Sequence, residues 1–391
     1  MKKILFVCYG LGIGGIERCL VNLINELDSN LYDIDLLLLN PEYNLLDEIT
    51  NKVTLLDTFK YSMNTENTYN HYKQDKNILK KVNNISKYII FRLINKYGQR
   101  PWKIFNKVEK TYDIAVSYSQ NGLTPYYVID KVNATRKYLW YHNGDYERTG
   151  KKYKLDLEYY SKFDNLVAVS TDCKKRLSQY FGNIQDKIIV MNNIVDTERI
   201  INLANSEQAI EIDKDSFSIL TVGRLTKEKG AELAVNVCKK LVDNGFNIKW
   251  YWVGDGNQAY YIKELTNKLG LEDVFYLLGN KNNPYVYMKQ CDLYVQPSKY
   301  EAYCTTTNEA RILNKPVVTT DVGGMKEQFI DKKTALIVKA DIESLYKSIA
   351  LLIDNKDYRE KIVLNLKHKN FEFKDYINDY NRLFLVEKKY E

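Results

Sequence analysis

Two glutamates, Glu301 and Glu309, stand eight positions apart in a polar loop and in the helix-like run that follows it. One strand-like segment, 292–296, precedes the loop and another, 315–320, follows the run. A carboxylate before the helix and one within it can hold hydroxyl groups on either side of a diphosphate, one on a sugar and one on a ribose. The first helical turn, which we place at Cys304–Thr307, offers backbone NH groups to that diphosphate. This spacing indicates a nucleotide-sugar site more than two solvated surface glutamates.

A basic pair in the second half of the chain fits the same ligand. Arg224 and Lys229 lie just after a strand-like segment, in the sequence Val-Gly-Arg-Leu-Thr-Lys-Glu-Lys-Gly of residues 222–230. A planar guanidinium and a mobile ammonium together neutralise a diphosphate, which gains negative charge as it departs. An isolated pair of this kind is often only a basic surface turn. Its occurrence together with the two glutamates favours a binding site.

A glycine-rich loop, 10–15, follows the first strand-like segment and formally matches the dinucleotide-binding pattern G-x-G-x-x-G. A nicotinamide site needs an acidic residue at the end of the second strand, where this chain has Asn40. We therefore expect Gly14 and Gly15 to let the backbone approach a ligand closely. Glu17 would open the following helix, where the helix dipole favours its charge.

His142 is one of three histidines and follows the strand-like segment 138–141. A single histidine is usually structural, but a position at the carboxyl end of a strand indicates a polar contact to a sugar hydroxyl in an interdomain crevice. Asp33 and Asp35 have the spacing of a metal-binding pair. They begin an apolar strand, however, and no other ligand cluster accompanies them, so we predict no metal site.

Short apolar segments alternate with helix-length segments through most of the chain. This alternation is typical of parallel sheets covered by helices on both faces. A polar stretch, 196–215, interrupts the pattern before it starts again with a second strand and glycine turn at 216–223. We therefore predict an α/β protein of two Rossmann-like domains, residues 1–200 and 201–370. The predicted strands are 3–8, 33–39, 52–56, 113–117, 137–140, 165–169, 187–191, 216–222, 248–253, 274–278, 293–296 and 316–319.

At 391 residues the chain is long enough for two hydrophobic cores of ordinary size. No stretch approaches the roughly 18 apolar residues of a membrane span. The first residues run into a strand-like segment without a signal-peptide cleavage site, so we expect a cytoplasmic protein. The six cysteines are scattered, with no Cys-x-x-Cys pair, and neither a zinc site nor a disulfide framework is predicted.

The net positive charge is concentrated in one segment, residues 73–110, where eleven basic and two acidic residues give a net charge of +9, against +7 for the whole chain. Apolar residues recur within it at helical spacing: Ile78, Val82, Ile85, Ile89 and Leu93. This is the pattern of a basic amphipathic helix. Two interpretations stay open, because the helix could lie on an anionic membrane or pack its apolar face into the core. Nucleic acid is a weaker expectation, since no recognition motif accompanies the charge.

Taken in order, these motifs resemble those of the retaining glycosyltransferases of family 4, which have the GT-B fold of two facing Rossmann-like domains. The resemblance spans nearly the whole chain. It rests on Gly14–Glu17, Tyr141–Asn143, Val222–Arg224 with Lys229, Trp252–Gly256, and Glu301–Glu309 followed by Val322–Gly324. It implies a deep cleft between the domains and a C-terminal helix, within 371–391, that packs back on the first domain. Members often carry glycine where this chain has Ala302 and Cys304, so the turn must accommodate side chains and the choice of donor stays open.

The resemblance also implies roles for single residues. Glu309 would hold the ribose and Glu301 the donor sugar, with the two basic residues on the diphosphate. Gly15 would contact the donor from the first domain, and His142 would lie beside the sugar on the acceptor side. The predicted catalytic residues are Arg224, Lys229, His142 and Glu301. The predicted donor-binding residues are Gly14, Gly15, Gly223, Gly279, Asn280, Lys281, Tyr303, Cys304, Thr305 and Glu309, with the base near 279–281.

The leading hypothesis is a metal-independent transferase that moves a hexose, with retention at the anomeric carbon, from a nucleotide donor that we expect to be a UDP-sugar. The acceptor would be a glycan or a lipid-linked molecule at the inner face of the plasma membrane, for a capsule or another bacterial surface polysaccharide. No protein nucleophile is identified, so catalysis would rest on positioning and on stabilisation of the departing diphosphate. A GT-B-type nucleotide-sugar epimerase is the alternative and predicts a changed donor with no transfer. A nicotinamide-dependent oxidoreductase is a third hypothesis and predicts nicotinamide binding at 10–15.

Overall fold

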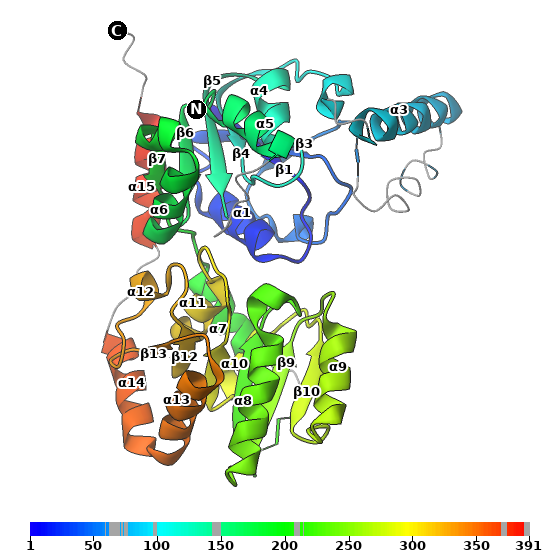
Figure 1. Cartoon of the computed structure of the whole chain (residues 1–391). Coiled ribbons are helices and arrows are strands. Elements are labelled where there is room, and N and C mark those ends of the chain that lie inside the picture. Colours follow the sequence, from blue (N-terminus) through cyan, green and yellow to red (C-terminus); the bar gives the residue numbers. More distant parts are fainter. Residues whose placement is uncertain are drawn as a thin grey trace.

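The computed structural model describes residues 1–58, 60–61, 71, 73, 77–96, 100–142, 150–206, 212–213, 215–368 and 374–386. Over these ranges the chain forms two α/β domains, each built on a parallel sheet, with the N-terminal domain above the C-terminal one in Figure 1. The predicted α/β fold of two domains is therefore confirmed.

The sheet of the N-terminal domain has seven strands in the described residues, in the order β3-β2-β1-β4-β5-β6-β7, and all neighbouring strands are parallel. Its central strand β1 is apolar and fully buried from Ile4 to Cys8, as expected where helices cover both faces. The strands are β1 (Lys2–Cys8), β2 (Tyr32–Leu38), β3 (Val53–Leu56), β4 (Thr111–Ser117), β5 (Asn133–Tyr141), β6 (Asn165–Ala168) and β7 (Ile188–Val190).

The sheet of the C-terminal domain has the order β10-β9-β8-β11-β12-β13 within the described ranges and is also parallel. Strand β13 is short, with three residues, and is not among the strands predicted from the sequence. The strands are β8 (Phe217–Val222), β9 (Ile248–Val253), β10 (Phe275–Gly279), β11 (Leu293–Gln296), β12 (Val317–Thr320) and β13 (Leu336–Val338).

Helices alternate with the strands and cover the sheets; α8 and α13, for example, pack side by side on the second sheet (Figure 1). The helices are α1 (Gly15–Glu26), α3 (Ile78–Lys96), α4 (Thr124–Lys131), α5 (Gly150–Tyr160), α6 (Thr171–Tyr180), α7 (Thr197–Ala204), α8 (Ala231–Asp243), α9 (Ala259–Lys268), α10 (Tyr285–Gln290), α11 (Thr305–Ile312), α12 (Met325–Gln328), α13 (Ile342–Asp354), α14 (Lys356–His368) and α15 (Lys374–Leu385).

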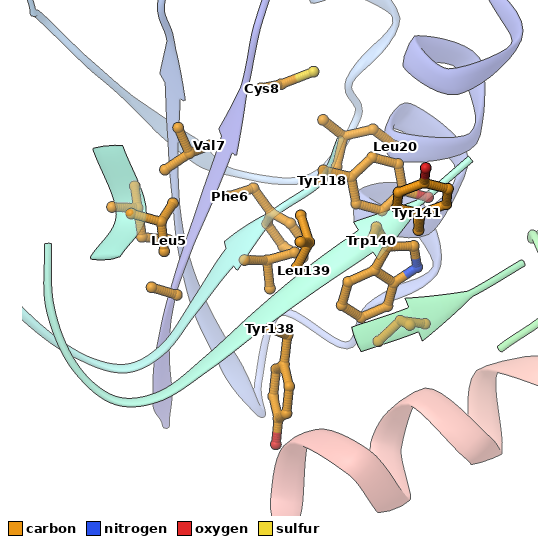
Figure 2. Packing of buried hydrophobic residues seen from close by; sticks show 14 of the residues in the cluster. Leu5, Phe6, Val7, Cys8, Leu20, Tyr118, Tyr138, Leu139, Trp140 and Tyr141 are labelled. Atoms are coloured by element: carbon orange, nitrogen blue, oxygen red, sulfur yellow. The ribbon is translucent and has the colours of Figure 1, made fainter. Parts of the chain in front are cut away.

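Helix α15 lies on the N-terminal domain although it comes last in the chain (Figure 1). Its Tyr380 and Phe384 are fully buried in the N-terminal core, where Tyr380 stacks on Trp140 with ring centroids 6.0 Å apart. Figure 2 shows Tyr138 of β5 pointing towards this helix, and its hydroxyl donates to the carbonyl of Leu383. The helix therefore supplies part of the N-terminal hydrophobic core.

Helix α7 carries the chain from the first domain to the second. It packs against α10 and α11 of the C-terminal domain, with Ile200 and Ala204 buried beside Tyr285. Residue 200, where the sequence places the domain boundary, lies in the middle of this helix.

Helix α3 is the basic amphipathic helix that the sequence predicts, and most of its predicted apolar face is exposed. Ile78, Val82, Ile89 and Leu93 are 52–75% exposed, whereas Ile85 is partly buried. The core instead receives Tyr88 and Phe91, which stack on each other, and Phe91 also stacks on Phe105 and packs against Tyr61. The interpretation that the predicted face packs into the core is therefore wrong for these four residues, because the aromatic side of the helix fills that place.

Candidate nucleotide-sugar site

A cavity of about 590 Å³ lies between the two domains. Its walls come from the loops that follow strands of both sheets, including residues after β1, β4, β5, β8, β10 and β11. The carboxyl ends of parallel strands carry ligand sites in α/β folds, because the loops there converge and helix N-termini point at the ligand. The cavity is therefore the candidate site.

Three glycines lie at the carboxyl ends of neighbouring strands of the C-terminal sheet, and two of them, Gly223 and Gly254, line the cavity. Gly223, Gly254 and Gly279 follow β8, β9 and end β10, and the NH of Gly254 donates to the carbonyl of Gly279 at 2.9 Å. A Cβ atom on Gly254 would collide with the carbonyl of Gly223. Gly254 also has a φ of +134°, which other residues rarely adopt. Close packing of the backbone therefore requires glycine at position 254, and Asn280 and Lys281 line the cavity beside Gly223 and Gly254.

Lys229 and Glu301 meet at the floor of the cavity. The Nζ of Lys229 lies 2.7 Å from Oε1 of Glu301, and the hydroxyl of Ser298 donates to the same oxygen at 2.7 Å. Burial alone would lower the pKa of Lys229, but the charge of Glu301 raises it above its ordinary value, so the ammonium stays protonated. Arg224 lines the cavity on the same side. Two cations and one carboxylate thus face the space predicted for the diphosphate and the sugar.

Helix α11 begins at this floor. Cys304 is its N-cap residue, and Thr305 and Thr306 of the first turn line the cavity, where their NH groups suit an anion. Burial raises the pKa of the Cys304 thiol to about 11, so it is protonated and unsuited to nucleophilic attack. Cys304 has a φ of −78°, and Ala302 is not among the residues with positive φ. Both positions therefore accept side chains where the family often has glycine.

Glu309, in the second turn of α11, is buried and lines the cavity. Burial raises its pKa to about 7, while Arg18 and Arg199 oppose this effect. The hydroxyl of Tyr285 donates to Glu309 Oε1 at 3.5 Å. Both arginines are held by Glu48, Arg18 by two hydrogen bonds and Arg199 by an ion pair of 2.7 Å. Because α1 carries Arg18 and α7 carries Arg199, this cluster joins the two domains beside Glu309.

The glycine loop of the N-terminal domain faces α11 across the cavity. A Cβ atom on Gly15 would lie 3.4 Å from the hydroxyl oxygen of Thr305, so the two domains approach closely there. The other end of the loop is occupied by protein, since a Cβ atom on Gly12 would lie 3.0 Å from the carboxylate of Glu42. A carboxylate in that position repels a cofactor diphosphate. Of the loop residues 10–15, Ile13, Gly14 and Gly15 line the cavity.

His142 directly follows the strand β5 and lines the cavity. Burial lowers its pKa to about 4, so the ring is neutral at physiological pH. Its Nε2 lies 3.0 Å from the carbonyl oxygen of Tyr118, which can only accept a hydrogen bond. Nε2 therefore carries the proton, and Nδ1 is the acceptor nitrogen. A neutral imidazole of this tautomer can accept a hydrogen bond from a sugar hydroxyl.

Two further contacts tie the Glu301 loop to the N-terminal domain. The hydroxyl of Ser170 donates to the carbonyl of Ala302 at 2.7 Å. The carboxylate of Glu327 accepts hydrogen bonds from the NH groups of Thr171 and Asp172, at 3.0 and 3.1 Å. Glu327 lies on α12 and caps the first turn of α6, which belongs to the other domain. The relative position of the domains therefore helps to shape the loop.

The structure brings nearly all the predicted site residues together around the cavity. Only Gly279 stands behind the wall, where its carbonyl accepts from Gly254. The residues that line the cavity as predicted are Gly14, Gly15, His142, Gly223, Arg224, Lys229, Asn280, Lys281, Glu301, Tyr303, Cys304, Thr305 and Glu309.

Sequence reasoning missed several cavity residues from the first domain and the linker. Arg18 and Arg199 stand alone in helices, without a second signal to separate them from surface arginines. Asn193 is 3% exposed, and its amide oxygen has no partner among the described residues. In the sequence it is only a polar side chain three residues after the short strand β7.

Asp33 and Asp35 take part in another interaction. The Nζ of Lys110 lies 2.9 Å from a carboxylate oxygen of Asp35 and 3.4 Å from one of Asp33, and the hydroxyl of Tyr112 donates to Asp35 at 2.6 Å. In the part of the chain that the structure describes, no group of three or more His, Cys, Asp or Glu side chains is placed to hold a metal ion.

Comparison with known proteins assigns both halves of the chain. Residues 13–199 match the family model described as Glycosyltransferase Family 4, and residues 204–369 match the one described as Glycosyl transferases group 1. The chain belongs to the GT-B glycosyltransferases. The junction between the two matches falls within α7, where the structure changes from one domain to the other.

Several curated relatives of this glycosyltransferase are similar in part of their sequence. An uncharacterised glycosyltransferase of Methanocaldococcus jannaschii is 29% identical over 57% of this chain and 59% of its own length. A Campylobacter jejuni protein is 29% identical over 57% of this chain and 59% of its own, and is named as a 4-alpha-N-acetylgalactosaminyltransferase that acts on a diphospho-undecaprenol-linked saccharide. A capsular polysaccharide biosynthesis glycosyltransferase of Staphylococcus aureus is 26% identical over 51% and 54%. Each match spans less than two thirds of the relative.

Solved structures of the same fold superpose over the whole glycosyltransferase chain. A glycosyltransferase of Rickettsia africae has a TM-score of 0.70 at 19% identity, with 98% of this chain and 97% of that one covered. Anabaena HepE, solved with UDP-glucose, has a TM-score of 0.69 at 17% identity, with 99% and 100% covered. At these identities the likeness establishes the GT-B fold. In the described parts of the chain, no helix is both long and apolar enough to cross a membrane.

Proposed function

We propose that the protein transfers a hexose from a UDP-sugar to a hydroxyl of a glycan or lipid-linked acceptor, with retention at the anomeric carbon and without a metal ion. The observation that carries the proposal is the cavity that Lys229, Arg224, the first turn of α11, Glu301 and Glu309 line together, with Glu301 in the loop before α11 and Glu309 in its second turn. This arrangement matches a sugar, a diphosphate and a ribose in that order.

The chemistry follows from charge. The bond between the anomeric carbon and the diphosphate oxygen breaks, and the negative charge that collects on the diphosphate is stabilised by Arg224, Lys229 and the NH groups of α11. The acceptor hydroxyl forms the new bond and gives its proton to the departing diphosphate. Retention by this route needs no protein nucleophile. Both described candidates at the floor are unsuited to that role, because the thiol of Cys304 is protonated and Glu301 is bound by Lys229 and Ser298.

Two further groups orient the sugars. Glu309 accepts hydrogen bonds from ribose hydroxyls, and Glu301 accepts one from the donor sugar while its other oxygen stays on Lys229. His142 accepts a hydrogen bond from a sugar hydroxyl through Nδ1. Correct positioning of the reacting groups supplies the rest of the rate acceleration.

The nature of the donor and acceptor is supported by relatives. HepE is solved with UDP and with UDP-glucose. The Campylobacter relative is named for an acceptor linked to diphospho-undecaprenol and the Staphylococcus relative for capsule synthesis. We infer a similar task here, in the cytoplasm at the inner face of the membrane, for a capsule or another surface polysaccharide. The epimerase hypothesis is not carried forward, because both matched family models and these relatives are glycosyltransferases.

A donor panel tests the proposal. A ligand that binds only the folded state raises the melting temperature, so UDP and one UDP-sugar should stabilise the protein while other nucleotides and NAD(P) should not. Glu309→Ala should abolish this stabilisation. With the donor identified, NMR of the product gives the anomeric configuration, and activity in EDTA tests metal independence. Stabilisation by NAD(P) alone, or an inverted product, would overturn the proposal.

A further inference from the structure

Helix α3 exposes large apolar side chains along one side. Six of them are 48–83% exposed, which is unusual for a helix of a folded domain. The six are Ile78, Leu79, Val82, Ile89, Ile90 and Leu93. Figure 1 shows that α3 projects from the side of the N-terminal domain, away from the C-terminal domain.

The exposed residues share one face. At about 100° per residue, they fall within an arc of roughly 120° around the helix axis. The buried aromatics Tyr88 and Phe91 lie on roughly the opposite side, where they join the stack with Phe105 and Tyr61. The helix is therefore anchored by its aromatic side, and its apolar arc, defined here as the six residues above, is directed outwards.

Basic residues border the apolar arc on both sides. By the same spacing, Lys87 lies beyond one edge, and Lys81 and Arg92 lie beyond the other. All three are at least partly exposed. The sequence of α3 contains five Lys or Arg and no Asp or Glu. Long basic side chains at such edges can place their charges among lipid headgroups while their stems cover apolar surface.

We propose that the apolar arc and its basic borders form a surface that docks on an anionic lipid bilayer, with α3 lying parallel to the membrane plane. A bilayer interface is the partner that matches both features at once, since acyl chains accept the apolar arc and anionic headgroups neutralise the bordering cations. A second protein would have to supply an apolar groove lined by acidic groups. This surface deepens the proposed function, because it holds the enzyme where a lipid-linked acceptor lies, but its test requires no catalysis.

Vesicle sedimentation tests the surface directly. The full-length protein is mixed with vesicles of phosphatidylcholine alone or with phosphatidylglycerol, and the pelleted fraction is measured at low and high salt. We expect binding only to anionic vesicles. A charge variant, K81Q/K87Q/R92Q, should lower the partition coefficient on the order of 100-fold at low salt, because each basic residue near an anionic surface contributes a factor of roughly five. An apolar variant, V82Q/I89Q/L93Q, should lower the partition coefficient on the order of 100-fold and should lose most of the binding that persists at high salt.

Matched controls change the same residue types on the C-terminal domain. K263Q/K268Q/K361Q removes three exposed lysines, and L351Q/L364Q removes two exposed leucines, so both should bind vesicles as the unchanged protein does. Melting temperature and stabilisation by UDP should be unchanged in the α3 variants, which shows that the fold and the donor site are intact. This readout separates the two proposals, since failure of donor binding leaves vesicle binding unaffected.

Three results would overturn the membrane surface. Equal pelleting of the unchanged protein with neutral and anionic vesicles contradicts the proposal, because the basic borders would then have no role. Binding of both α3 variants at the level of the unchanged protein also contradicts it. So does a dimer in sedimentation velocity that the apolar variant dissociates, if no vesicle binding accompanies it, because the occupant of the arc would then be a second copy of the chain.

Discussion

The ammonium of Lys229 lies 2.7 Å from the carboxylate of Glu301, and both side chains are largely buried. The two groups expected to act on the diphosphate and on the sugar therefore hold each other in place. Removal of either one leaves the other as a charge without its partner, so each substitution should affect stability as well as catalysis.

Lys229→Met should lower kcat on the order of 10²- to 10³-fold, because one stabilising group at the departing diphosphate is lost. It should also cost about 3 kcal/mol of stability, since Glu301 stays buried and unpaired. The double variant Lys229→Met with Glu301→Gln should recover much of that stability but none of the activity. Denaturant unfolding and initial rates measure the two effects. If the double variant were as unstable as the single one, the pairing argument would fail.

Arg224→Lys is a matched test of geometry at constant charge. A lysine cannot reproduce the planar fork of a guanidinium on a diphosphate, so we expect kcat to fall roughly tenfold or more with unchanged melting temperature. The kcat of the Arg224→Ala variant should be lower still. Full activity in the lysine variant would show that only the charge matters at this position.

Donor binding should depend on the ionisation of Glu309. Its pKa of about 7 means that the carboxylate, which accepts the ribose hydroxyls, is lost as pH falls through 7. UDP affinity measured by calorimetry should therefore weaken between pH 8 and pH 6. Arg199→Gln removes one of the two cations that lower this pKa, so the midpoint should move to higher pH. A midpoint that stays in place would show that Arg199 does not act on Glu309.

The same group links stability to pH with a definite sign. The folded pKa of Glu309 lies above that of the unfolded chain, so the folded state binds more protons between about 4.5 and 7. Stability is therefore lost as pH rises through this window, by on the order of 3 kcal/mol. Glu309→Gln should be more stable than the unchanged protein at pH 8 and similar to it near pH 5, although it binds no donor. Thermal melts at the two pH values check this difference.

Glu327→Gln tests the contact between the domains. The neutral amide is a weaker acceptor for the NH groups of Thr171 and Asp172, and the charge at the N-terminus of α6 is lost. We expect the contact between the two domains to be weaker by about 1 kcal/mol and the KM for the donor to rise several-fold, with kcat little changed. Small-angle scattering should show a larger radius of gyration. Lys326→Gln, at the neighbouring exposed position, is the control and should leave both quantities unchanged.

Most strands of both sheets can be predicted from the sequence because buried parallel strands are largely apolar runs, as in β1 and β9. Much of the site can be predicted because the loops at the carboxyl ends of parallel strands converge in such folds. Glycines, acidic residues and basic residues at these strand ends therefore lie together, and Arg224 and Glu301 line one cavity. The positions of Arg18 and Arg199 in the site could not be predicted, since the sequence around a single arginine in a helix does not indicate which residues it contacts. The sequence also does not show which side of α3 faces the core, because the aromatic side with Tyr88 and Phe91 and the aliphatic side are both apolar. Tertiary packing determines that the aromatic side is buried.

The position of α15 has a consequence for synthesis on the ribosome. Domains commonly fold as they emerge, the first one before the second. Here Trp140 and Phe6 of the first domain contact Tyr380 and Phe384, which leave the ribosome only after the whole second domain has been made. The N-terminal domain therefore exposes the apolar surface that α15 covers until this helix has been synthesised. A stop codon before residue 374 would leave that surface uncovered permanently, and the truncated product should depend on chaperones to remain in solution.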